Sequence, residues 1–320
     1  MLHDCVAEII PIEPDADNAA AGIASDIHTY YIRYDVMLGA VSIPYFLLVV
    51  RPTDAPPNKK KTKSMRYICA LTIAGSDSCG GAGVQADIKT MSALGVYAAS
   101  AITSVTVQNT LGVQAIQAIQ PEIVAGQIRA VMDDIKPTAI KVGMVNDLAT
   151  ILAIADTLQQ YSPQKLVVDP VMVSTSGSML MQEDALGTFC SRLLPMATLL
   201  TPNIPEAEVL SNRSIRSIDD MDAAGRSILA LGCKAVLIKG GHLEGRKVDK
   251  LYLPNGEVCS FVHEALATRN THGTGCTLSS AIAAFMARGL ALADAVAQAQ
   301  TYLSQALEAG KDAVAYTPLT

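Results

Sequence analysis

The chain has 320 residues, half of them apolar, although tryptophan is absent and only 4% of the residues are aromatic. A chain of this length folds as one large domain or two ordinary ones, and an apolar content dominated by small aliphatic residues favours an α/β fold over a β-sandwich. The formal net charge of −6 argues against a nucleic-acid-binding surface, because phosphate backbones are held by clustered Lys and Arg.

The first 64 residues differ in texture from the rest of the chain. They are acidic at the start, then carry an apolar stretch over 37–50 and a stretch rich in proline and lysine, and no helical or strand period persists. Two interpretations stay open: an extra strand or helix packed on the main domain, or a poorly ordered leader outside the functional chain, with Met65 as an alternative translation start. We expect an N-terminal extension over 1–64 and one domain over 65–320.

The first 64 residues and the cysteines also indicate the cellular compartment of the protein. The apolar stretch is shorter than the ~20 residues of a spanning helix and contains Pro44, and acidic residues stand where a secretory signal needs a basic region. The seven cysteines are an odd number without a CxxC pair, a poor disulfide framework and a poor zinc site. We therefore expect a cytoplasmic protein with no membrane span.

From residue 67 onward, short β-branched runs alternate with segments of helical spacing. Strands are expected at 70–74, 139–142, 166–168, 198–200 and 235–238, and helices around 84–91, 123–131, 147–158, 219–231 and 278–288. This order predicts an α/β fold with a doubly wound, mostly parallel central sheet and helices on both faces. Ligands of such sheets bind beyond the carboxyl ends of the strands, where polar and glycine residues concentrate here.

The most informative of these loops covers 271–277 and leads into the predicted apolar helix at 278–288. Gly273 and Gly275 bracket a turn whose first N–H groups lack helical partners and sit at the positive end of the helix dipole, so we expect a phosphate there. The GxxxxGK[ST] spacing of the Walker loop is absent. Cys276 should have some thiolate character in that field, unless it is simply a small buried hydrophobe.

Three charged residues follow other strands. Asp169 and Glu206 are candidate Mg²⁺ ligands, because Mg²⁺ prefers oxygen; either could instead be a helix cap or a loop anchor. Lys239 lies at a strand end, where its ammonium could reach a phosphate, although an isolated lysine is often a surface charge. His242 and His272 are interpreted as loop-stabilising.

Two further residues suit a small polar substrate. Asp87 lies one turn into the helix that follows the glycine-rich turn 80–83 and is positioned to bond a substrate hydroxyl. Gln108 carries a donor and an acceptor on one planar amide, which matches a ring nitrogen beside an exocyclic amine.

A series of motifs in a fixed order resembles the hydroxymethylpyrimidine/phosphomethylpyrimidine kinases of thiamine biosynthesis, members of the ribokinase-like superfamily. The motifs are AGSDS and GGAGVQADIKT within 74–90, KVGM at 141–144, DPVM at 169–172, TPN with Glu206, KGGH at 239–242 and HGTGCT at 272–277. The resemblance implies ATP-dependent phosphorylation of 4-amino-5-hydroxymethyl-2-methylpyrimidine and then of its monophosphate, with Mg²⁺, in a homodimer without nucleic-acid or membrane partners.

The resemblance also implies residue roles. The pyrimidine pocket would be lined by Gly75, Asp87, Gln108, Met144, Val171 and Cys276. ATP and its metal would face Thr201, Asn203, Glu206 and Lys239. The turn Gly273 to Cys276 would cover the transferring phosphoryl group, and Cys276 would accept or relay the hydroxymethyl proton. The alternatives are a pyridoxal kinase of the same branch and a non-catalytic pyrimidine-binding module.

Overall fold

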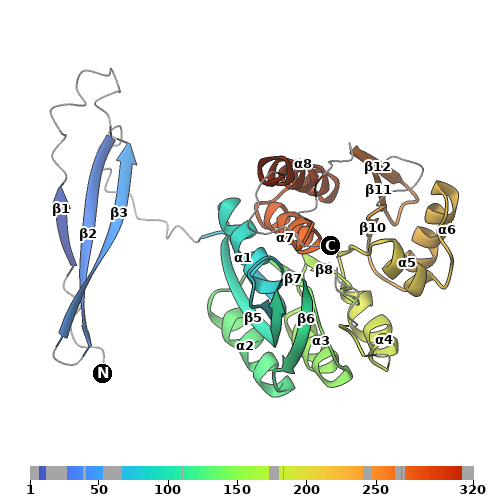
Figure 1. Ribbon diagram of the computed structural model, residues 1–320, viewed down its shortest axis with the longest axis horizontal. Helices are drawn as coiled ribbons and strands as arrows, with labels where there is room; N and C mark the ends of the chain where they lie inside the picture. The colour runs from blue at the N-terminus through green and yellow to red at the C-terminus, as the bar shows by residue number, and fades with distance from the viewer. Residues whose placement is uncertain are drawn as a thin grey trace. The chain divides into compact units, whose positions relative to one another are not determined.

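The computed structural model describes residues 7–11, 27–38, 41–52, 67–109, 111–172, 180–182, 184–240, 247–263, 268 and 271–311. The chain divides into two compact units, Met1–Met65 and Arg66–Thr320. The first contains three antiparallel strands in the order β1-β2-β3, namely β1 (Ala7–Pro11), β2 (Ile27–Leu38) and β3 (Val41–Pro52) (Figure 1). Sequence patterning gave no sign of these strands, and the place of the extension outside the functional chain stays a prediction.

The second unit is built on a nine-stranded sheet with the order β12-β11-β10-β9-β8-β7-β4-β5-β6. All neighbours from β10 to β5 are parallel, and the β5–β6, β10–β11 and β11–β12 pairs are antiparallel. The strands are β4 (Cys69–Asp77), β5 (Tyr97–Asn109), β6 (Gly112–Ala118), β7 (Ala139–Val142), β8 (Leu166–Val168), β9 (Leu199–Leu200), β10 (Val236–Ile238), β11 (Lys247–Tyr252) and β12 (Val258–His263). The predicted mostly parallel sheet is confirmed.

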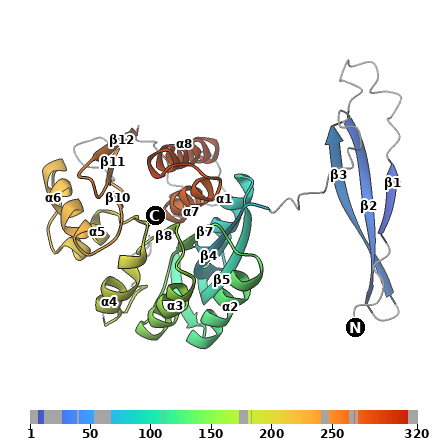
Figure 2. The same ribbon diagram turned by 180° about the vertical axis from the view of Figure 1, so that it is seen from behind.

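Helices cover both faces of this sheet, as predicted (Figures 1 and 2). One face packs against α2 (Pro121–Asp134), α3 (Leu148–Tyr161), α4 (Ala185–Thr188), α5 (Ile204–Ser211) and α6 (Ile218–Leu229). The other packs against α1 (Gly83–Ala93), α7 (Thr274–Ala287) and α8 (Leu292–Gly310). Because side chains of a strand alternate between faces, Leu71 and Ile73 join the first core and Ala70 joins the second.

Side-chain caps define where several helices begin. Asp147 precedes α3 and accepts a hydrogen bond from the Thr150 N–H at 2.8 Å. Ser217 and Asp220 form a reciprocal capping box at the start of α6. Such caps satisfy backbone donors that have no partner inside the helix, so these polar residues set the helix starts that the apolar periodicity only approximates.

The structure bears on the predictions about the cysteines and about membrane spans, for the described residues only. The cysteines among them are all free, namely Cys69, Cys79, Cys190, Cys233, Cys259 and Cys276. No helix in the described ranges is long and apolar enough to cross a membrane. The prediction for His242 lies outside the described residues.

Candidate active site

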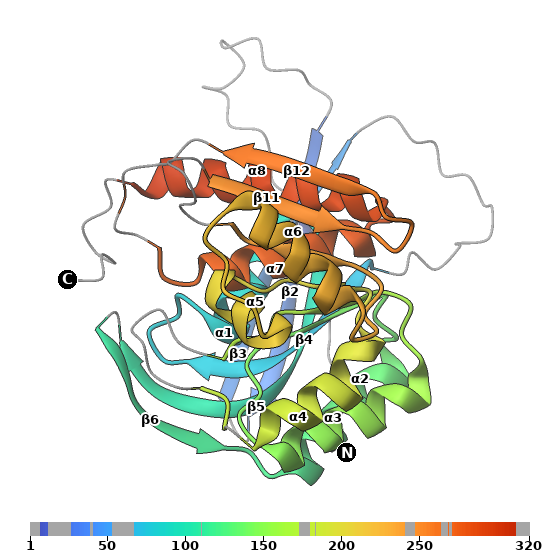
Figure 3. The same ribbon diagram turned by 90° about the vertical axis from the view of Figure 1, so that its right-hand side faces the viewer.

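A pocket of about 330 Å³ opens beyond the carboxyl ends of the central strands, at the edge that the sheet topology predicts. It lies between the ends of β4 and β5, the loops after β7, β8, β9 and β10, and the start of α7. Figure 3 shows β4, β5 and α7 from the side. Its wall includes the predicted site residues Gly75, Gln108, Met144, Asp169, Val171, Asn203, Glu206, Lys239, Gly273, Gly275 and Cys276. Two predicted residues, Asp87 and Thr201, are not on this wall.

The turn into α7 exposes backbone donors to the pocket. Gly273 is the N-cap with φ of 79°, and a Cβ there would lie 1.8 Å from the Gly81 carbonyl oxygen, so both the conformation and the space demand glycine. The first helical hydrogen bond runs from the Thr277 N–H to the Gly273 carbonyl at 2.8 Å, which leaves the Gly275 and Cys276 N–H groups outside the helical ladder. The turn therefore presents the donors and dipole of an anion site.

Lys239 brings a positive charge to the same turn. A Cβ placed on Gly275 would lie 3.4 Å from Lys239 Nζ and 3.7 Å from Asp169 Oδ2. The ammonium also donates to Asp169 Oδ1 at 2.9 Å, and 18% of the lysine side chain is exposed. Lys239 is therefore no isolated surface charge, since it is held between the anion site and a buried carboxylate.

Asp169 is the centre of a buried cluster of polar side chains. Thr201 donates its hydroxyl to Oδ1 at 2.9 Å, and Ser279 donates to Oδ2 at 3.2 Å. Burial acts to raise the pKa of Asp169, but the charges of Lys239 and Lys141 outweigh it and hold this pKa below its ordinary value. Thr201, which was expected at ATP, is itself fully buried and orients this carboxylate instead.

Glu206 combines a capping role with a place on the wall. Its Oε2 accepts the Asn203 N–H at 2.9 Å, and the Asn203 side chain accepts the Glu206 N–H at 2.9 Å, which closes a capping box on α5. The helix-cap alternative is thus correct for one carboxylate oxygen. Burial raises the pKa of Glu206 to about 7, against the opposing charge of Lys239.

The expected thiolate character of Cys276 is wrong for the free pocket. The residue does lie in the first turn of α7 and on the wall. Burial nevertheless raises the pKa of its thiol to about 11, and the neighbouring charge of Lys141 only partly opposes that rise. Loss of hydration disfavours the thiolate, and the nearby charges of Asp87 and Asp169 disfavour it further.

Asp87 lies beneath the pocket and not on its wall. Its carboxylate is fully buried and pairs with Lys141 Nζ at 2.8 and 3.0 Å, and it accepts the Thr72 hydroxyl. Burial lowers the pKa of Lys141, but the Asp87 carboxylate more than reverses this, and the net pKa is raised, so the lysine stays charged. The packing of α1 directs Asp87 toward Lys141 and off the pocket wall.

A family model described as phosphomethylpyrimidine kinase matches residues 77–317. The chain belongs to the phosphomethylpyrimidine kinase family. It is 48% identical to the hydroxymethylpyrimidine/phosphomethylpyrimidine kinase of Rhizobium meliloti (strain 1021), over 75% of this chain and 90% of the relative. The match begins after the extension, so it bears on the second unit alone.

Solved structures of a phosphomethylpyrimidine kinase and of a pyridoxal kinase share the fold of this chain. The Clostridium difficile 630 phosphomethylpyrimidine kinase is 46% identical, with a TM-score of 0.68, over 75% of this chain and 99% of that one. The ADP complex of Bacillus subtilis pyridoxal kinase is 34% identical, with a TM-score of 0.70, over 76% and 92% of the two chains. The ribokinase-like fold expected from the resemblance is confirmed.

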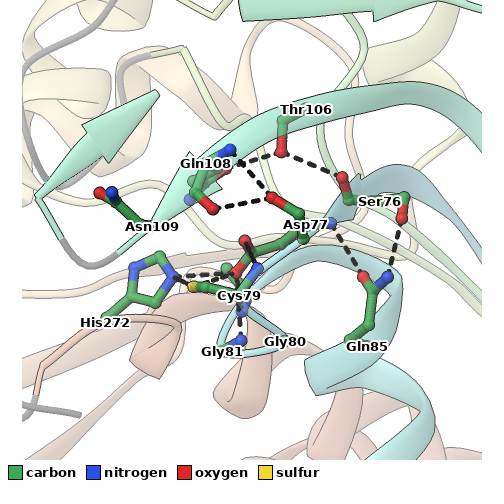
Figure 4. A network of polar contacts seen from close by, with 12 residues as sticks. Ser76, Asp77, Cys79, Gly80, Gly81, Gln85, Thr106, Gln108, Asn109 and His272 are labelled. Carbon is green, nitrogen blue, oxygen red and sulfur yellow. Dashed lines mark hydrogen bonds and ion pairs between the residues drawn. The ribbon is translucent and has the colours of Figure 1, made fainter. Parts of the chain in front are cut away.

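Gln108 is held at the mouth of the pocket by hydrogen bonds with Thr106 and Ser78. Its Oε1 accepts the Thr106 hydroxyl at 3.0 Å (Figure 4). Its backbone N–H donates to the Ser78 hydroxyl at 2.9 Å, and that hydroxyl donates to its carbonyl at 2.7 Å. The Nε2 donors of the amide are not used in either contact. Gln108 therefore keeps part of its hydrogen-bonding capacity for a ligand.

Sequence reasoning assigned no role to two residues that lie on or beneath the pocket wall. Asp77 anchors the glycine turn by accepting the Gly81 and Ala82 N–H groups at 3.1 and 2.8 Å. Lys141 is the other, and its signal was present: a lysine inside a four-residue run that is otherwise apolar and buried. His272 contacts Asp77 through Nε2 at 2.9 Å, which confirms its loop-stabilising role.

Proposed function

We propose that this chain transfers the γ-phosphoryl group of ATP to the hydroxymethyl oxygen of 4-amino-5-hydroxymethyl-2-methylpyrimidine, and then a second phosphoryl group to the resulting monophosphate. One observation carries the proposal. An anion turn, an ammonium held against it, and a planar amide with free donors all open into a single pocket. This is the arrangement that a kinase of a small aminopyrimidine alcohol requires.

The phosphoryl group would lie at the start of α7. The Gly275 and Cys276 N–H groups and the Lys239 ammonium are the donors there, and the helix dipole adds to their field. Phosphoryl transfer needs little covalent participation by the protein, because positioning and stabilisation of charge supply most of the rate. A preformed set of donors serves that purpose, since it costs no rearrangement during the reaction.

The pyrimidine ring would lie between Gln108 and the apolar part of the wall. Gln108 can donate from Nε2 to a ring nitrogen, while Met144 and Val171 offer apolar contact to the ring faces. Asp87 is not part of this subsite, because it is buried beneath the wall.

Cys276 would relay a proton in the first step. Its thiol is protonated near neutral pH, since burial raises its pKa to about 11. As the acceptor oxygen bonds to phosphorus and the bond from phosphorus to ADP breaks, Sγ takes the hydroxyl proton and passes its own proton to a phosphoryl oxygen. The second step attacks with a phosphate oxygen that is already ionised and needs this relay much less.

Asp169 and Glu206 would hold Mg²⁺. Both offer carboxylate oxygen on the wall, and the raised pKa of Glu206 marks a buried carboxylate that a nearby cation would help to ionise. When bound, Mg²⁺ would neutralise charge on the ATP phosphates. Lys239, already paired with Asp169, would share that task at the anion turn.

An ATP-consumption panel tests the proposal, with the hydroxymethylpyrimidine, its monophosphate and pyridoxal as acceptors. We expect turnover of both pyrimidines. A preference for pyridoxal of about tenfold or more, some 1.4 kcal/mol in transition-state energy, would contradict the proposal, and ligand binding without ATP turnover would favour a binding module. Lys239→Met should abolish turnover, whereas Lys234→Met, at an exposed position, should leave it unchanged and exclude a contaminating kinase.

A further inference from the structure

A thiol, an imidazole and a carboxylate meet at the rim of the pocket. Asp77 ends β4, Cys79 lies in the turn before α1, and His272 lies two residues before α7 (Figure 4). His272 Nε2 is 2.9 Å from Asp77 Oδ2 and 3.4 Å from Cys79 Sγ, and Sγ is 3.2 Å from the same Oδ2. Three atoms of different chemistry thus share one small volume, and each is a metal-ligating type.

The separations suit a tetrahedral ion. Zinc bonds of about 2.3 Å to sulfur and about 2.0–2.2 Å to nitrogen and oxygen place the ligand atoms about 3.3–3.6 Å apart. The observed separations of 2.9–3.4 Å are shorter by a few tenths of an ångström. Small side-chain rotations of Cys79 and His272 would open the triangle to fit the ion.

The surroundings already hold two of these groups in place. The Gly81 and Ala82 N–H groups donate to Asp77 Oδ2, and the Cys79 N–H donates to Oδ1. The imidazole packs on Gly81, where a Cβ would lie 2.5 Å from His272 Cδ2. Outer hydrogen bonds of this kind orient metal ligands.

We propose that Asp77, Cys79 and His272 form a binding site for Zn²⁺, with water in the fourth position. Sγ loses its proton when the ion binds, and the imidazole presents the Nε2 lone pair by moving its proton to Nδ1. About one proton is therefore released for each ion bound. The inference does not depend on the proposed phosphoryl transfer.

Zinc at this position would join the glycine turn to the anion turn. Asp77 and His272 both line the pocket, and His272 directly precedes Gly273. An ion fixed between them would occupy the rim through which an acceptor enters. We therefore expect Zn²⁺ to inhibit turnover by the parent chain.

Direct zinc binding tests the site on the full chain. Zn²⁺ is titrated in competition with a chromophoric chelator against the parent, Cys79→Ser and Cys259→Ser, the last being a matched control on β12. We expect the tightest site to weaken at least about tenfold in Cys79→Ser alone, because even outer partners of a metal are worth 10–100-fold. Cys79 is not on the pocket wall, so Cys79→Ser should turn over normally in zinc-free buffer that contains Mg²⁺, and should resist inhibition by added Zn²⁺.

A second readout excludes a structural effect of the serine. Co²⁺ in place of Zn²⁺ should give a thiolate-to-cobalt charge-transfer band in the parent and in Cys259→Ser, and no such band in Cys79→Ser. Equal zinc affinity of the parent and Cys79→Ser would overturn the proposal. So would a parent cobalt complex without the thiolate band.

Discussion

Replacing Asp87 with Asn should destabilise the second unit strongly while leaving its shape unchanged. Asp87 and Lys141 both have fully buried side chains and contact each other at 2.8 and 3.0 Å. Asn keeps the size and the contact with Thr72 but removes the carboxylate that pairs directly with the Lys141 ammonium. Breaking a buried ion pair in this way costs about 3–5 kcal/mol, a large part of the ~5–15 kcal/mol that stabilises a typical domain.

Urea denaturation followed by ellipticity at the helix band measures the loss, because every helix in the described part of the chain lies in the second unit. Asp156→Asn is the matched control: the same substitution breaks the Asp156–Arg192 pair, whose side chains are 58% and 42% exposed. That surface pair should contribute no more than about 1 kcal/mol.

Two outcomes would refute this reasoning. The first is a loss in Asp87→Asn as small as that in Asp156→Asn. The second concerns Lys141→Met added to Asp87→Asn, which removes the unpaired charge and should recover at least half of the loss. No recovery would mean that Asp87 stabilises the fold by some other contact. A raised KM for the acceptor without lost stability would instead support a role for Asp87 in binding the substrate.

Two predictions concern the pocket wall. Because burial raises the pKa of Glu206 to about 7 from an ordinary 4.5, the folded chain keeps a proton that the unfolded chain has lost; this contribution is complete below about pH 4.5 and disappears as the pH rises through about 7. Stability in EDTA should therefore fall over that range, and less so in Glu206→Gln, as urea midpoints would show; parallel profiles would contradict the assignment. Cys276→Ala should slow the first phosphorylation by about 10²–10⁴ and the second much less, in single-turnover assays with each acceptor. Equal slowing of both steps would make the role of Cys276 structural.

Periodicity located five of the six parallel strands, but it missed β5 and the antiparallel strands toward the edges of the sheet. The runs around 70–74 and 139–142 are apolar throughout because β4 and β7 are buried on both faces. The edge strand β6 carries two glutamines and is largely exposed, and half of the residues of β11 are lysine or aspartate. Such strands depend on their neighbours for pairing, so a single segment carries little signal for them.

Local backbone chemistry likewise determined the anion turn. A glycine-bracketed turn that opens a helix has free N–H groups whatever packs around it, and Gly273 to Cys276 stand on the wall as expected. The order of motifs along the strand ends also placed Lys239, Asp169 and Glu206 at one edge, since parallel strands share their carboxyl ends.

Tertiary packing decided what each ionisable group does there. The face of α1 that meets the sheet sends Asp87 to Lys141 and away from the pocket, and burial keeps the Cys276 thiol protonated against its helix dipole. Cys79 and His272 stand 193 residues apart in a chain whose cysteine spacing gives no sign of a metal site, yet their side chains meet at 3.4 Å. Desolvation and long-range contact belong to the assembled fold, so no local pattern can report them.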